Sequence, residues 1–299
     1  MDQVVLGSFS PSVLLDVARS TGRLEEQGLA VEEVAVASSP GQFRSLIDGE
    51  LTAGLTSPDN VLAYRYDPRN PLGEVADVRM VAAVDRGLGL ALYGRPGTTA
   101  ADLRGATVGV DVPNSGFALA LYSLAESLGA PREDYELVAL GSTPKRLQAL
   151  LEGRCLFTML NAGNELVAEE RGCVRLASVA ERLSPYLGTV VAVVGEEHAP
   201  VAGRLARALT ATAAAIVGGS LRAETAAAAA TRLGLDRALA ERYVDRLCDP
   251  LEGLVPDGVV DRAALQTLVE LRTTYLPVVP GAGKGDGLPS ALDDPRLVH

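Results

Sequence analysis

The segment that most constrains the fold is residues 107–128, TVGVDVPNSGFALALYSLAESL. A short β-branched run is followed by a polar break at 111–116 and then by apolar residues at three- and four-residue spacing. This order predicts a buried strand, a loop and an amphipathic helix whose N-cap is Asn114 or Ser115. Free amides at the start of such a helix favour a carboxylate, phosphate or sulfonate. Taken alone, an ordinary strand–helix turn capped by its own side chain explains the loop more simply.

The same strand–loop–helix unit recurs along the chain. The predicted strands are 4–6, 29–36, 51–56, 78–84, 88–93, 107–110, 135–140, 154–160, 174–179 and 189–194. Helical patterns lie between most of these strands, which is typical of a mostly parallel sheet with helices on its faces. Beyond position 199 the pattern is helical, with segments at 201–217, 223–233, 238–247 and 261–275.

Two complete series of such units, followed by helices, predict an α/β fold of two lobes with a cleft between them and C-terminal helices. We expect the first lobe to comprise residues 1–87 and 188–280, and the second to comprise 88–187. The chain would cross between the lobes at these boundaries. The remaining segment, 281–299, opens with several glycines and follows two prolines, so we expect a flexible tail that adds nothing to the core.

Charge and composition argue against several classes of function. The formal net charge of −11 disfavours nucleic acid and anionic membranes as partners, and no apolar run approaches the length of a membrane span. The three cysteines show no CxxC spacing and only two histidines are present, so we expect neither a metal site nor a cofactor. Because the chain enters a strand at once without a signal-peptide pattern, we expect a cytoplasmic protein, or a periplasmic or extracellular one if a signal was removed.

Three segments carry a likeness to a known family. These are VARSTGRLEEQGLAVE at 17–32, LRGATVGV at 103–110 and STPKRLQALLEG at 142–153. In this order and spacing, with the loop at 113–116, they resemble the type 2 periplasmic-binding-protein superfamily. The branch that they resemble includes the alkanesulfonate-, nitrate- and taurine-binding proteins and the thiamine-pyrimidine synthases. The chain departs from that branch at 154–157, where Arg-Cys-Leu-Phe replaces the usual Asp-Ala, and it lacks the cysteine-rich motif of the pyrimidine synthases.

The first functional hypothesis is a binding module that holds a small anionic or polar organic molecule between the lobes. Hydroxyls, amides and backbone N–H groups in the loops that leave the strands suit such a ligand, although each of these residues could equally be a helix cap. The candidate ligand-binding residues are Ser8, Phe9, Ser10, Ser38, Ser39, Thr56, Ser57, Asn60, Asn114, Ser115, Gly116, Phe117, Ser142, Thr143, Asn161 and Asn164.

The alternative is a cytosolic enzyme on the same fold. The resemblance implies members that eliminate from or decarboxylate small carboxylic acids in biosynthesis, which would make this chain a cofactor-free lyase. The candidate acid, base, clamp and nucleophile residues are Asp59, Asp85, Arg86, Asp111 and Cys155. The simpler interpretations are a core thiol for Cys155, a helix cap for Asp59 and a hinge ion pair for Asp85 and Arg86. A ligand-sensing protein is a third hypothesis.

Overall fold

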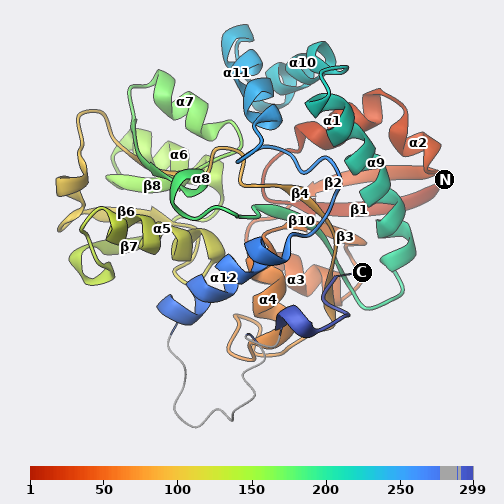
Figure 1. The fold of residues 1–299 in the computed structure, drawn as a ribbon, viewed down its shortest axis with the longest axis horizontal. Coiled ribbons are helices and arrows are strands. Elements are labelled where there is room, and N and C mark those ends of the chain that lie inside the picture. The colour runs from red at the N-terminus through yellow and green to blue at the C-terminus, as the bar shows by residue number, and fades with distance from the viewer. Residues whose placement is uncertain (277–287, 289–290, 299) are drawn as a thin grey trace.

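Two five-stranded sheets, each covered by helices, form the two lobes of the protein (Figure 1). The computed structural model describes residues 1–276, 288 and 291–298. The first sheet has the order β2-β1-β3-β10-β4 and the second the order β7-β6-β8-β5-β9. The strands are β1 (Asp2–Ser8), β2 (Leu29–Ala35), β3 (Ala53–Thr56), β4 (Val78–Asp85), β5 (Ala91–Gly94), β6 (Thr107–Val110), β7 (Glu136–Ala139), β8 (Phe157–Leu160), β9 (Val174–Ser178) and β10 (Thr189–Val194).

Helices follow most strands, as the sequence pattern predicts. The first-lobe helices are α1 (Val13–Ser20), α2 (Arg23–Glu26), α3 (Ser39–Ile47) and α4 (Pro58–Tyr66). The second lobe has α5 (Gly116–Ser127), α6 (Thr143–Glu152), α7 (Asn164–Glu170), α8 (Val179–Arg182) and the 3₁₀ turns η1 (Ala100–Leu103) and η2 (Arg132–Asp134). The C-terminal elements are α9 (Ala199–Val217), α10 (Arg222–Leu233), α11 (Arg237–Cys248), α12 (Arg262–Tyr275) and η3 (Ala291–Asp293). The predicted fold class, two α/β lobes with C-terminal helices, is confirmed.

The sheets are mostly parallel, as predicted, because in each of them four strands run in one direction and a single strand runs against them. The pairs β1–β2, β1–β3, β6–β7 and β6–β8 are parallel. In contrast, β10 is antiparallel to β3 and β4, and β5 is antiparallel to β8 and β9. Both β5 and β10 are the first strands after the chain changes sheet. A crossover helix on the same sheet returns the chain in the parallel direction, whereas a strand that arrives from the other lobe has no such helix before it.

The hydrophobic core does not stop at the lobe boundary. One cluster of buried side chains contains Met80 and Val190 of the first sheet, Leu92 and Val108 of the second, and Leu268 of α12. Helix α12 packs against α4 of the first lobe and α5 of the second, and it lies below the junction of the lobes in Figure 1. Helix α12 therefore joins the lobes, in addition to the two chain crossings.

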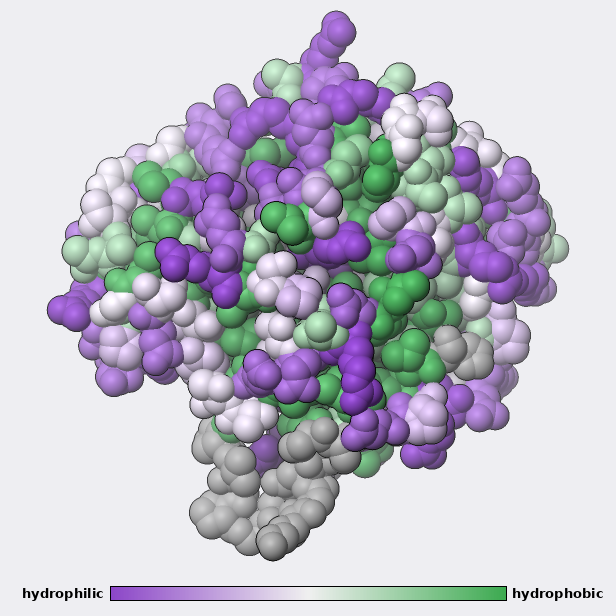
Figure 2. Space-filling model, viewed as in Figure 1, coloured by the Kyte–Doolittle hydropathy of each residue, from purple (hydrophilic) through white to green (hydrophobic). Residues whose placement is uncertain are grey.

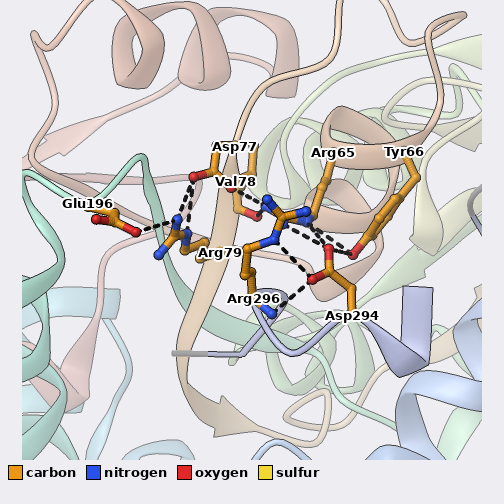
Figure 3. Close-up of polar contacts among 8 residues, drawn as sticks. All are labelled: Arg65, Tyr66, Asp77, Val78, Arg79, Glu196, Asp294 and Arg296. Atoms are coloured by element: carbon orange, nitrogen blue, oxygen red, sulfur yellow. Dashed lines mark hydrogen bonds and ion pairs between the residues drawn. The ribbon is translucent and has the colours of Figure 1, made fainter. Parts of the chain in front are cut away.

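The end of the chain packs on the first lobe, so the prediction that the tail adds nothing to the core is wrong for the described residues 291–298. Ala291 and Leu297 are fully buried, and the Leu297 carbonyl accepts a hydrogen bond of 2.8 Å from the Met80 amide at the edge of β4. Asp294 accepts hydrogen bonds from Arg65 and Tyr66 (Figure 3). The sequence prediction missed Ala291 and Leu297 because the segment before them is rich in glycine. Residues 281–287 lie outside the described part of the chain.

Polar residues cover much of the molecular face shown in Figure 2, and apolar residues show between them toward the middle. Among the described residues, no single helix is long and apolar enough to span a bilayer; α9 and α10 meet that criterion only as a pair bent by 111°.

Candidate ligand-binding cleft

A cleft of about 1200 Å³, counting its open mouth, lies between the two sheets. Loops that follow β1, β2 and β3 line it from the first lobe, and loops that follow β6, β7 and β8 line it from the second. Residues of both chain crossings and of α11 complete the wall. The cleft therefore lies at the carboxyl ends of the strands, where ligands bind in open α/β sheets.

All but two of the predicted ligand-binding residues line this cleft. The lining residues are Ser8, Phe9, Ser10, Ser38, Ser39, Thr56, Ser57, Asn60, Ser115, Gly116, Phe117, Ser142, Thr143 and Asn161. Asn114 instead lines a neighbouring pocket together with Arg272 and Leu276. Asn164 is the first residue of α7, and its side-chain amide donates to the Asn161 carbonyl at 3.0 Å. The loops are thus brought together as expected, and ligand contact by their residues stays a prediction.

Two of the predicted catalytic residues, Asp85 and Asp111, also line the cleft. Cys155 does not, because it is buried in the second-lobe core, where burial raises the pKa of the thiol to about 11. Asp59 is buried and ion-paired with Arg272. Arg86 donates to the Leu254 carbonyl at 2.6 Å and forms no ion pair with Asp85 within the described residues. These three side chains therefore do not line the cleft with Asp85 and Asp111.

Side chains of the loop before α5 supply most of the hydrogen bonds at the start of that helix. Ser115 is the N-cap, and its Oγ accepts a hydrogen bond from the Ala118 amide at 3.1 Å. The same hydroxyl donates to Asp111 Oδ1 at 2.5 Å. This arrangement fixes the Asp111 carboxylate on the cleft wall and leaves fewer free amides than the sequence pattern suggests.

Arg146 is absent from the predicted set, although it lies in the cleft wall. Its side chain is buried, with 2% of the residue exposed, and it is the only lysine or arginine among the lining residues. The guanidinium donates to three neutral oxygens: Gly141 O at 2.7 Å, Thr143 Oγ1 at 2.9 Å and Met159 O at 3.2 Å. No carboxylate of the described residues lies within ion-pair distance. Burial lowers the pKa of Arg146, and the Asp111 charge opposes this effect.

A signal for Arg146 is present in the sequence. Arg146 precedes Ala149 and Leu150, both fully buried, by three and four residues on α6. It therefore lies on the stripe that an amphipathic helix turns toward the protein interior. A charged residue on such a stripe needs hydrogen-bond partners or a counter-charge, because burying an ion without them is costly.

A chain of hydrogen bonds connects Arg146 to the first crossing between the lobes. Arg146 donates to the Thr143 hydroxyl, which donates to Asn161 Oδ1 at 3.3 Å. The Asn161 side-chain amide then donates to the Gly87 carbonyl at 3.1 Å. Two polar side chains of α6 and one from the loop after β8 are thereby held in fixed positions against the crossing segment.

The wall next to this crossing holds two non-glycine residues in the left-handed backbone region. These are Leu88 and Ala162, with φ of 50° and 54°, and both line the cleft. The Ala162 amide donates to the Leu88 carbonyl at 2.9 Å. Such conformations cost free energy and persist where the surrounding structure fixes them, which is frequent at binding sites.

The first lobe and α11 supply an apolar part of the cleft wall. Buried lining residues on this side are Leu14, Leu55, Val84, Leu88, Tyr243, Leu247 and Leu254, and all belong to one core cluster. Asp85 lies beside them, 3% exposed, and burial raises its pKa to about 6. The sequence pattern gave no reason to place α11 at the cleft, because the helix lies far along the chain from the first-lobe loops that line it.

Among the described residues, no group of three or more His, Cys, Asp and Glu side chains is arranged to hold a metal ion. No protein-family model matches the chain, and no curated protein matches it.

Solved structures match the chain over most of its length. One is the ligand-binding component of an ABC-type import system from Staphylococcus aureus with zinc bound, with a TM-score of 0.74, 14% identity and 92% of each chain covered. Another is the alkanesulfonate-binding protein SsuA from Xanthomonas axonopodis pv. citri bound to MOPS, with a TM-score of 0.72, 17% identity, and 92% of this chain and 94% of that chain covered. A third is the desulfurization enzyme DSZB, with a TM-score of 0.57, 15% identity and 92% of each chain covered.

These likenesses define the fold. The chain has the two-lobed fold of the type 2 periplasmic-binding proteins, as its sequence motifs predict. Its structural neighbours include ligand-binding components of import systems and an enzyme, so the fold by itself does not assign an activity.

Proposed function

We propose that this protein binds a small organic anion in the cleft, with the acidic group of the ligand at Arg146 and its apolar part against the wall formed by the first lobe and α11. The observation that carries the proposal is a buried guanidinium in the cleft wall without a carboxylate partner. Hydrogen bonds to neutral oxygens orient the guanidinium but give it no ion-pair partner, and a ligand carboxylate or sulfonate would supply one.

The shape of the cleft supports an amphipathic ligand. Leu88, Leu247 and Leu254 offer apolar surface, while Thr143 and Asn161 keep Arg146 in place on the other side. SsuA from Xanthomonas axonopodis binds MOPS, which carries a sulfonate on an organic body. A ligand of that chemistry would match both walls of this cleft.

Native mass spectrometry of the purified protein tests the proposal first, because it captures any molecule that remains bound. Isothermal titration calorimetry with hexanesulfonate, hexanoate and neutral hexanamide then compares head groups at constant chain length. We expect one or both anions to bind and the amide to bind at least about tenfold more weakly, since charge-assisted hydrogen bonds contribute about 1.5–3 kcal/mol. Equal binding of the amide, or a neutral co-purified molecule, would contradict an anion site.

A second candidate function is a cofactor-free lyase acting on a small carboxylic acid. Asp85 favours it, because a carboxyl group in the cleft with a pKa near 6 can give or accept a proton close to neutral pH. The likeness to the desulfurization enzyme is consistent with chemistry on this fold. Product analysis by mass spectrometry after incubation with a panel of carboxylic acids separates the two functions. Loss of carbon dioxide or water that disappears in Asp85→Asn would support the lyase, whereas unchanged ligands would support binding alone.

A further inference from the structure

The two lobes touch where α4 and α5 begin. Asp59 is the second residue of α4 in the first lobe, and Gly116 is the first residue of α5 in the second. A Cβ atom built on Gly116 would lie 2.6 Å from Asp59 Cβ and 3.0 Å from Asp59 Oδ2. Only a residue without a side chain admits the carboxyl group at this distance, and the Gly116 amide partly opposes the rise that burial causes in the pKa of Asp59.

Helix α12 holds the same carboxylate from a third direction. Arg272 Nη1 donates to Asp59 Oδ2 at 2.9 Å, and Nη2 lies 3.7 Å from Asp67 Oδ2 at the end of α4. Asp59 and Arg272 are 1% and 3% exposed. Asp59 thus contacts both the helix that bridges the lobes and the first turn of α5, where the macrodipole favours negative charge.

The contact between the lobes also has an unfavourable free-energy contribution from buried polar atoms. Asp59 Oδ1 and Arg272 Nε are buried without a hydrogen-bond partner in the described part of the chain. Burial raises the pKa of Asp59 against the attraction of the Arg272 guanidinium. Separation of the lobes would let water reach both unpaired atoms, so hydration favours the open arrangement while charge pairing favours the closed one.

We propose that Asp59 is a built-in anion at the start of α5 that keeps the two lobes in contact before any ligand arrives. The carboxylate occupies the position that the sequence pattern offers to a ligand. As a consequence, which rests on the proposed function, the acidic group of a ligand is directed to Arg146 instead of the first turn of α5.

The test uses the ligand-free protein, so its outcome is independent of anion binding at Arg146. Small-angle X-ray scattering measures the radius of gyration, and hydrogen exchange measures protection of the amides at 116–120, for the wild type, Asp59→Asn and Asp67→Asn. Asp67→Asn is the matched control, because Asp67 also neighbours Arg272 but is the C-cap of α4, at the opposite end of that helix from Asp59. We expect Asp59→Asn to enlarge the particle and to speed exchange at α5 about tenfold, while Asp67→Asn leaves both unchanged.

Gly116→Ala changes the second-lobe side of the contact and leaves both residues of the Asp59–Arg272 ion pair unsubstituted. Its Cβ would overlap the Asp59 side chain, so we expect the same enlargement and faster exchange. If Asp59→Asn fails to fold, Gly116→Ala alone decides. A folded Asp59→Asn or Gly116→Ala variant with wild-type dimensions and protection would overturn the proposal, and so would an equal opening in Asp67→Asn.

Discussion

Arg146 and Arg272 are two arginines buried to the same extent in different surroundings, and the contrast bears on the binding role proposed for Arg146. They are 2% and 3% exposed. Arg272 meets the Asp59 carboxylate at 2.9 Å, whereas Arg146 meets only carbonyl and hydroxyl oxygens. A buried ion without a counter-ion is unfavourable, so the partner of Arg146 is expected from outside the chain.

Their positions in the fold explain the difference. Arg272 projects from α12 into the junction of the lobes, where α4 and α5 also meet. Arg146 lies in the wall of the open cleft. Arg65 resembles Arg272 in having carboxylate partners. Its side chain is 5% exposed and ion-paired with Asp77 and Asp294, so it joins the chain end to the first lobe (Figure 3).

The largest expected effect is on stability, from Arg272→Met. This variant leaves the Asp59 carboxylate buried and unpaired, which costs about 3–5 kcal/mol in the free energy of unfolding. Urea unfolding followed by circular dichroism measures the loss. Arg262→Met is the control, since the Arg262 side chain is on the same helix and 65% exposed. A loss below about 1 kcal/mol would show that the Asp59–Arg272 pair is not a structural one.

Arg146→Gln should act on binding more than on stability. Loss of the charged donor is expected to weaken hexanesulfonate or hexanoate about 10- to 150-fold by calorimetry, which corresponds to about 1.5–3 kcal/mol. The unfolding free energy should fall less than in Arg272→Met, because no buried carboxylate is stranded. Lys145→Gln, at an exposed neighbouring position, controls for the change in net charge. Unchanged affinity in Arg146→Gln would place the anion elsewhere.

Asp294→Asn tests the ion pair between Arg65 and Asp294. Burial by itself would raise the pKa of Asp294, but hydrogen bonds from the Arg296 amide and the Arg65 guanidinium hold this pKa well below its usual value. A lowered carboxyl pKa contributes stability that is present above about pH 4 and is lost as the pH falls below it. We expect Asp294→Asn to lower the unfolding free energy by about 1–2 kcal/mol at pH 7, and less at pH 3. The exposed Asp293→Asn should show no such pH-dependent loss.

The smallest expected effect concerns Asp85. Because burial raises its pKa to about 6, the native state binds more protons than the unfolded state between about pH 4 and 6. The unfolding free energy contributed by this group therefore falls as the pH rises through that window, and Asp85→Asn should abolish the fall.

The negative charge of Asp85 should also weaken the binding of an anion in the cleft. Hexanesulfonate, whose own charge is constant, is expected to bind the wild type a few-fold more tightly at pH 5 than at pH 7, and Asp85→Asn should flatten this dependence. An identical pH profile in the variant would indicate that Asp85 does not sense the ligand.

Most of the cleft lining could be predicted from the sequence, because it consists of loops that follow strands. Ser8, Ser57, Ser115 and Thr143 stand directly after or shortly after apolar runs, and parallel strands carry such residues to one edge of a sheet. Tyr243 and Leu247 could not be found in this way. They lie on a helix whose apolar stripe is explained equally well by packing against any neighbour.

The sequence by itself determined what depends on neighbouring residues. Ser115 caps the helix that begins one residue later, and Gly49 and Gly153 end helices with positive φ, because these contacts and conformations involve only a few residues along the chain. Only the tertiary structure decided which charges meet. Asp59 and Arg272 are separated by 213 positions, and the carboxylate that looks like a helix cap in sequence becomes the contact between two lobes and a bridging helix. Likewise, the local pattern places Arg146 on the inward-facing stripe of α6 but does not show which groups it meets there. That Arg146 forms hydrogen bonds but no ion pair with the described residues depends on how the chain folds around it.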